Sequence, residues 1–112
     1  MALYMYQAAY TAESWAAQIQ IKNPQNRVEA VGKQACEAVG GKLVGGWLCF
    51  GGYDLVIIAD VPDDESMSAI ALAIAAGGAL KASKTTKLMT GAQGVEALKK
   101  AEAVAKTYRP AR

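Results

Sequence analysis

The chain has 112 residues, of which 53% are hydrophobic and 20% charged, and it carries a net charge of +2. This length fits one domain over residues 1–112, and this composition excludes a disordered chain. A protein with so small a net charge lacks the strong basic field of a dedicated nucleic-acid binder, so we expect no nucleic-acid partner.

The sequence contains no histidine and two cysteines, Cys36 and Cys49, far apart in the chain. A closed zinc site needs about four Cys or His ligands, and haem is usually held by His, so we expect no metal and no cofactor. The apolar stretch 69–80 is shorter than the roughly 20 residues of a membrane span, and residues 1–10 lack a leader pattern. We therefore expect a cytoplasmic protein that does not contact a membrane. In the cytoplasm, free thiols stay reduced.

Residues 3–10 alternate as a strand does, with three tyrosines on one of its two faces. Thr11 has the side chain of an N-cap, so a short helix carrying Trp15 is expected next. Asn23 and Pro24 suit an N-cap and a first helical position, which predicts that a second helix starts there. This helix is expected to end at Gly40-Gly41.

Residues 43–50 predict a second strand, in which two internal glycines indicate a β-bulge. Gly51-Gly52 predicts a hairpin turn into a third strand over residues 53–61. Pro62 ends that strand. The three acidic residues that follow favour the start of a third helix, where the helix dipole stabilises negative charge.

Residues 80–89 predict a fourth strand, and their polar side chains place it near a sheet edge. Thr90 and Gln93 fit a capping box, and the helix that follows is expected to bury Val95 and Leu98. The order strand, helix, strand, strand, helix, strand predicts a ferredoxin-like α+β domain. It has a four-stranded antiparallel sheet and an additional C-terminal helix.

The third strand predicts that the protein is not a monomer. Leu55, Ile57 and Ala59 point to one side of it, and Val56 and Ile58 point to the other. A ferredoxin-like sheet has helices on one face only, so a monomer would carry polar residues on the other. Each exposed large aliphatic side chain forgoes about 1.5–3 kcal/mol of burial. A homo-oligomer, with a second copy packed sheet to sheet, is the simplest solution.

Five short motifs follow one another along the chain: Asn23-Pro24, Arg27-Val28-Glu29-Ala30, Gly40-Gly41-Lys42-Leu43, Gly52-Tyr53-Asp54 and Pro62-Asp63-Asp64. Together with the Ala-rich helix after them, they make residues 4–98 closely resemble the GYD domain, a family named for the fourth motif. The resemblance implies a fold similar to dimeric α+β barrels, in which two sheets pack together. It implies little about function, because these small bacterial and archaeal proteins are mostly uncharacterised.

Two charged positions are candidates for chemistry. Asp54 would serve as a general base or a ligand acceptor, with Tyr53 beside a substrate. The favoured interpretation is structural, since an Asp at the exit of a glycine turn can bond nearby backbone N–H groups. Arg27 lies in the first turn of its helix, which is unfavourable for a cation. It is either a solvated surface residue or held there by a carboxylate of a partner or by an anionic ligand.

The aromatic residues are the remaining candidates. Trp15, Trp47 and the tyrosines of the first strand could line a pocket for an apolar ligand, although a core or interface role is favoured. The leading hypothesis is thus a self-associating module that binds a small apolar or anionic ligand or a protein partner. The alternative is a small cofactor-free enzyme, similar to a monooxygenase or isomerase. Its acid or base would be Asp54, Asp60 or a tyrosine, near the Gly52-Tyr53-Asp54 hairpin.

Overall fold

The computed structural model describes residues 1–111, and its helices and strands follow the predicted order. They are β1 (Ala2–Tyr10), α1 (Ala12–Ile19), α2 (Arg27–Ala38), β2 (Lys42–Leu48), β3 (Leu55–Val61), α3 (Asp64–Ala76), β4 (Leu80–Leu88) and α4 (Gly91–Ala105). The four strands form one antiparallel sheet in the order β2-β3-β1-β4. This is the ferredoxin-like arrangement, and it confirms the predicted fold class.

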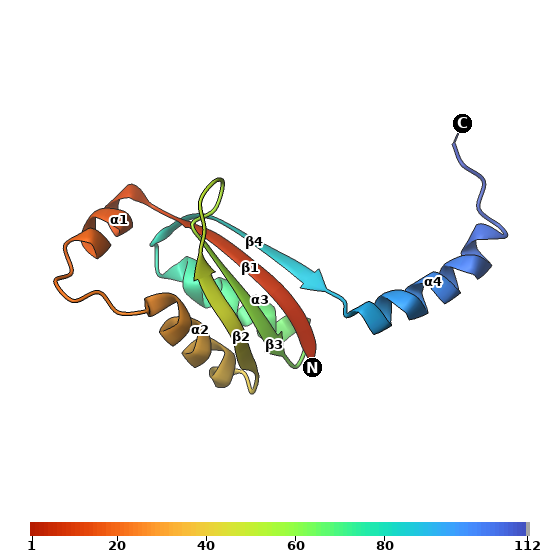
Figure 1. Ribbon diagram of the computed structural model, residues 1–112, viewed down its shortest axis with the longest axis horizontal. Coiled ribbons are helices and arrows are strands. Elements are labelled where there is room, and N and C mark those ends of the chain that lie inside the picture. The colour runs from red at the N-terminus through yellow and green to blue at the C-terminus, as the bar shows by residue number, and fades with distance from the viewer. Residues whose placement is uncertain (112) are drawn as a thin grey trace.

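Helices α2 and α3 lie on one face of the sheet, and the core fills the space between them and the strands (Figure 1). Alternate residues of the two central strands supply this core, because side chains along a strand point to opposite faces. From β3, Ile57, Ala59 and Val61 are buried. Cys36 of α2 and Met67 of α3 close the core from the helix side.

The opposite face of the sheet, here called the open face, is half-exposed and mixes apolar side chains with polar ones such as Gln7 and Lys84. Met5 of β1 pairs with Ile58 of β3, and Trp47 of β2 pairs with Val56. The indole of Trp47 lies over Gly45, where an added Cβ would come within 2.7 Å of the ring. Met5, Val56 and Ile58 are each partly accessible, and α2 and α3 both pack on the other side.

The predicted glycine irregularity in β2 is confirmed, since the register of β2 on β3 shifts between Leu43 and Gly45. The predicted two-residue hairpin turn is wrong. β2 ends at Leu48 and β3 begins at Leu55, so residues 49–54 form a longer loop. Within it, the Cys49 N–H donates to the Asp54 carbonyl at 2.8 Å.

The predicted start of α2 is also wrong. Asn26, and not Asn23, is the N-cap, because its side-chain oxygen accepts the backbone N–H of Glu29 at 3.2 Å. Both asparagines have the chemistry of an N-cap. Pro24 therefore lies in the irregular connection between α1 and α2, and Arg27 becomes the first helical residue.

Helix α4 starts as predicted but is not buried as predicted. The capping box is present: Gln93 N–H donates to Thr90 Oγ1 and Thr90 N–H donates to the Gln93 side chain. The helix then projects away from the sheet beyond β4 (Figure 1). Val95 is 51% exposed and Leu98 75% exposed. An amphipathic pattern shows that one side of a helix needs a partner, but it does not say which chain supplies it.

No helix within residues 1–111 has both the length and the apolar content needed to cross a bilayer.

Two glycines of the short motifs, Gly41 and Gly52, are expected to respond differently to substitution. A Cβ at Gly41 would lie 2.6 Å from the carbonyl oxygen of Asp60, whereas nothing lies within 4 Å of one at Gly52. We expect Gly41→Ala to lower the free energy of unfolding by about 1–3 kcal/mol, and Gly52→Ala to change it by less than about 0.5 kcal/mol. Urea unfolding measures both, and equal losses would contradict the structure.

Candidate functional site

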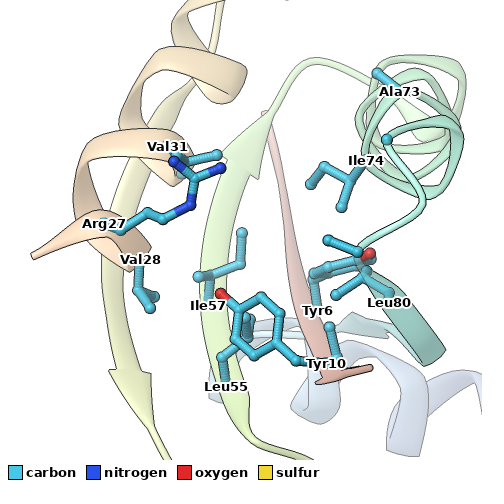
Figure 2. A pocket seen from close by; sticks show the side chains of 14 residues that line it. Tyr6, Tyr10, Arg27, Val28, Val31, Leu55, Ile57, Ala73, Ile74 and Leu80 are labelled. Carbon is cyan, nitrogen blue, oxygen red and sulfur yellow. The ribbon is translucent and has the colours of Figure 1, made fainter. Parts of the chain in front are cut away.

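A cavity of about 360 Å³ lies between the sheet, α2 and α3. Tyr6, Tyr10 and Ile57 line it from the sheet, Val28 from α2 and Ile74 from α3 (Figure 2). Its size and its mainly apolar lining match those of small-molecule sites in proteins. It is therefore the leading candidate for a functional site in the described part of the chain.

The cavity exists because the two helices pack against different parts of the sheet. Gly32 allows α2 to approach the sheet closely, since an added Cβ would be only 3.1 Å from Leu43 Cδ1. Helix α3 is held through the buried residues Met67 and Ile70 in its first half. Its last turn and the connection to β4 present mostly small residues to the cavity, Ala73, Gly77 and Ala79. Space is left where side chains are too small to fill it.

Arg27 supplies the positive charge beside the cavity. It is the first residue of α2, and its guanidinium reaches over the space that Val28 and Val31 also line (Figure 2). Among residues 1–111, the ion pairs are Lys87–Asp64 and Lys99–Glu96, and neither involves Arg27. Arg27 is exposed, as the solvated-surface interpretation expects, and its planar donor set is available to an anion.

Two tyrosine hydroxyls accompany Arg27. Tyr10 points its hydroxyl toward α2 (Figure 2). Burial raises the pKa of Tyr10, and the charge of Arg27 partly opposes that rise. Tyr6 points toward Ile74 and Leu80 and is 1% exposed. Burial also raises the pKa of Tyr6, so both phenols are protonated donors at neutral pH.

The Tyr6 hydroxyl has no hydrogen-bond partner among the described residues. The Ser83 side chain is near enough to oppose the rise in the pKa of Tyr6 partly, but no well-formed hydrogen bond joins the two. A buried hydroxyl without a partner costs about 1–3 kcal/mol, so most such groups in native proteins are satisfied by protein, water or ligand. The hydroxyl oxygen itself is closed off from solvent and from the cavity, so a molecule bound in the cavity would not reach it in this structure.

Asp54 and Trp15 do not line the cavity but support it from outside. Asp54 Oδ2 accepts the backbone N–H of Tyr10 at 2.8 Å and the indole N–H of Trp15 at 3.3 Å. The Asp54 N–H donates to the carbonyl of Ala8 at 2.8 Å. Trp15 packs edge-on against Tyr10, with ring centroids 5.0 Å apart. Asp54 thereby fixes the end of β1, from which Tyr10 enters the cavity.

The other two sequence-predicted residues lie elsewhere. Tyr53 is half-buried in the loop before β3, where its carbonyl accepts the Cys49 thiol at 3.2 Å. Trp47 lies on the open face, on the side of the sheet opposite to the cavity. The structure thus brings Arg27 together with Tyr6 and Tyr10, and not with Tyr53 or Asp54.

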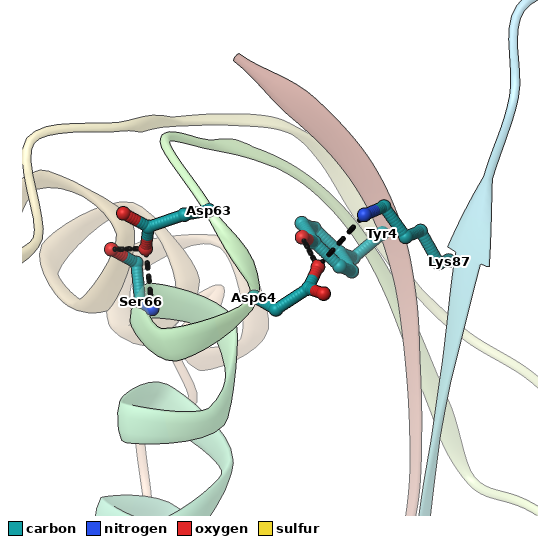
Figure 3. Close-up of polar contacts among 5 residues, drawn as sticks. All are labelled: Tyr4, Asp63, Asp64, Ser66 and Lys87. Carbon is teal, nitrogen blue, oxygen red and sulfur yellow. Dashed lines mark hydrogen bonds and ion pairs between the residues drawn. The ribbon is translucent and has the colours of Figure 1, made fainter.

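A polar cluster that the sequence did not reveal lies at the start of α3 (Figure 3). Asp64 accepts the hydroxyl of Tyr4 and the ammonium of Lys87, the latter at 2.9 Å. These two donors lower the pKa of Asp64, Tyr4 having the larger effect. Asp63 caps the helix by accepting the Ser66 N–H at 2.8 Å. The cluster ties α3 to β1 and β4, and its exposure to solvent suits a structural contact.

Within residues 1–111, no group of three or more Cys, Asp or Glu side chains is placed to hold a metal ion.

These features define the class of the protein: it is an antiparallel α+β domain with a ligand-sized cavity under its helices. The sequence matches the GYD domain over residues 4–98, nearly the whole chain, and the protein belongs to that family. None of the curated proteins matches this sequence.

Two solved structures share the fold. MtbAldR is 11% identical and superposes with a TM-score of 0.55 over 80% of this chain. The matched region is 52% of MtbAldR, so the chain spans about half the length of that protein. TTHA0845 from Thermus thermophilus is 17% identical, with a TM-score of 0.52 over 81% of this chain and 96% of its own. At these identities the likeness shows the fold alone.

Removing the Asp54 carboxylate is expected to cost stability. Asp54→Ala leaves the Tyr10 N–H and the Trp15 indole without their acceptor, which should lower the free energy of unfolding by about 1–3 kcal/mol. Glu37→Ala, at an exposed position of α2, is the control and should change it by less than about 0.5 kcal/mol. Urea denaturation followed by tryptophan fluorescence measures both. An Asp54→Ala protein as stable as the parent would free that carboxylate for a role in chemistry.

Proposed function

We propose that this GYD-domain protein is a cytoplasmic, self-associating module that binds a small molecule between its sheet and its helices. The observation that carries the binding function is the apolar cavity, which has the Arg27 guanidinium and the Tyr10 hydroxyl at one side. Pockets of this kind combine an apolar lining with a few polar groups that orient the ligand.

Self-association is supported first by the open face. Met5 and Ile58 pair across the middle of the sheet, and Val56 and Trp47 extend this apolar strip toward β2, with Gln7 as the polar neighbour of Val56. Strands of seven to nine residues at about 3.3 Å per residue give this face a length of roughly 25 Å. The matching surface of a second copy would remove it from water.

Helix α4 is the second support. Its apolar side carries Ala97, Leu98, Ala101 and Val104 at spacings of one, three and three, while Lys99 lies on the opposite side. The chain has a radius of gyration of 17.8 Å, whereas a compact domain of this length has about 13 Å. A capped helix with an apolar side that its own sheet leaves exposed is suited to packing on another copy.

A dimer could use both apolar surfaces. It would combine face-to-face packing of two sheets with docking of two helices, each of 15 residues and therefore about 22 Å long. Stable protein interfaces typically bury about 1,200–2,000 Å², which is the area that such a dimer would have to cover.

The alternative, a cofactor-free enzyme, is less well supported by the cavity. Its ionisable lining residues are Tyr6, Tyr10 and Arg27, and no carboxylate lines it. Burial raises the pKa of both tyrosines, which disfavours the phenolate that a general base would require. Asp54 is used by backbone and indole donors. Binding without turnover is the function that these groups suit best.

Charge placed on the apolar surfaces should dissociate the oligomer. We expect the parent protein to sediment as a dimer or larger species at micromolar concentration. Ile58→Lys and Leu98→Glu should each raise the dissociation constant at least tenfold, because a buried charge lacks a partner. Lys99→Glu, on the polar side of α4, should leave it unchanged. A parent protein that sediments as a stable monomer would exclude self-association.

Occupation of the cavity can be followed by methyl NMR of the full chain. We expect a neutral apolar probe, indole, to shift the methyl resonances of Ile57 and Ile74, which line the cavity, because apolar cavities of this size accept small aromatic molecules. Ile58, on the open face, serves as the internal control. Shifts at Ile58 with none at Ile57 or Ile74 would place binding outside the cavity and contradict the proposed site.

A further inference from the structure

We propose that the outer side of α3 is a docking surface for α4 of a second copy, and that the two helices pack there as an antiparallel pair. The inference rests on the proposed self-association and names the surfaces that meet. The outer side of α3 consists of Glu65, Ala69, Leu72 and Ala76, which are exposed and recur every three or four residues. It lies on the helix side of the sheet, so it does not compete with the open face for a partner (Figure 1).

Helix α3 is apolar on all of its sides beyond its first turn. Residues 66–80 contain no charged side chain, and a helix of this kind is typically covered all round. The sheet covers its inner side, where Met67 and Ile70 are buried. On its outer side, Leu72 is 71% exposed. Residues 1–111 of the same chain therefore leave the outer side of α3 uncovered.

The apolar side of α4 matches this surface in length and in the size of its side chains. It extends over seven residues from Ala97 to Val104, and the apolar part of the outer side of α3 extends over seven from Ala69 to Ala76. Both stripes are therefore about 10 Å long. Each has alanines beside a single leucine, and small side chains at a contact allow two helices to approach closely.

Charge sets the direction of the pair. Helix α3 begins with three carboxylates at residues 63–65, whereas residues 99–109 carry four cations and one carboxylate. Lys87 already pairs with Asp64, but the ion pairs among residues 1–111 do not involve Glu65. Antiparallel packing places the basic end of α4 at the acidic start of α3, and it also opposes the two helix dipoles favourably. Parallel packing would place the basic end against the uncharged end of α3.

The connection after β4 requires that the antiparallel partner is another copy. Lys87, near the end of β4, contacts Asp64 at 2.9 Å, so α4 leaves the sheet beside the start of its own α3. The chain from Leu88 to Gly91 spans at most about 11 Å, whereas the 13 residues of α3 extend over about 20 Å. The first turn of α4 cannot reach the far end of its own α3. Instead α4 projects beyond β4, where a second copy can receive it (Figure 1).

The test is an isotope-filtered NOE experiment on a mixture of methyl-labelled and unlabelled full-length protein, which detects contacts between different copies. We expect cross-peaks between Ala69 and Val104 and between Ala76 and Ala97, because antiparallel packing brings these pairs together. Cross-peaks between Ala76 and Val104 would indicate a parallel pair and contradict the direction. Cross-peaks between Val104 and Ile58 would place α4 on the open face of the partner and overturn the docking surface.

A charge on the docking surface should weaken the contact. We expect Leu72→Glu to raise the dissociation constant measured by sedimentation at least tenfold, because the carboxylate would be buried against the apolar side of α4. Gln34→Glu, at an exposed position of α2, adds the same charge and should leave the dissociation constant unchanged. Circular dichroism of both variants checks that the fold is retained.

Reversal of charge tests the direction a second time. Glu65→Lys and Lys106→Glu should each raise the dissociation constant about three- to tenfold, since each places like charges at the same end of the helix pair. The double variant should recover most of the parent affinity, because the opposite charges then face each other again. A double variant weaker than both single variants would contradict the antiparallel pairing.

The outcomes separate this interface from self-association itself. If Ile58→Lys weakens the oligomer and Leu72→Glu does not, the docking surface on α3 is wrong although self-association stands. If the parent protein is a monomer at every concentration, the proposed self-association fails and the docking surface fails with it.

Discussion

Strand β3 carries aliphatic side chains on both of its faces, and the helices of one chain pack on only one of them. The face with Ile57, Ala59 and Val61 is buried under α2 and α3. The face with Val56 and Ile58 stays partly accessible. Burial of apolar surface is the main driving force of folding and association alike, so the unpaired face favours a second copy. The exposed side of α4 adds to the same tendency.

On the helix face, the packing of the two helices explains where the proposed ligand site lies. Helix α2 packs closely on the β2–β3 side of the sheet because two glycines lie at the contact. An added Cβ at Gly32 would meet Leu43, and one at Gly46 would meet Val28. Helix α3 is fixed at its start by Asp64, which holds Tyr4 and Lys87. The motif Gly52-Tyr53-Asp54 contributes indirectly, because Asp54 holds the backbone from which Tyr10 reaches the cavity.

The sequence was sufficient for the fold because local signals agreed with one another. Alternation in β1 and β3 and the capping box at Thr90 and Gln93 are read within a few residues. The cavity could not be predicted in this way, since it depends on small residues of α3 facing α2, which is far away in the chain. The acceptor role of Asp54 was expected from turn chemistry, but its main partner, Tyr10, lies 44 residues away.

The central claim, that the open face is buried between copies, is tested most directly by adding a soluble paramagnetic probe to methyl-labelled protein. The relaxation of Val56 and Ile58 methyl groups reports how closely solvent approaches them. The account predicts slow relaxation at about 100 µM protein and faster relaxation on dilution below the dissociation constant. Ile57, under the helices, should relax slowly throughout. Fast relaxation of Val56 and Ile58 at every concentration would contradict the account.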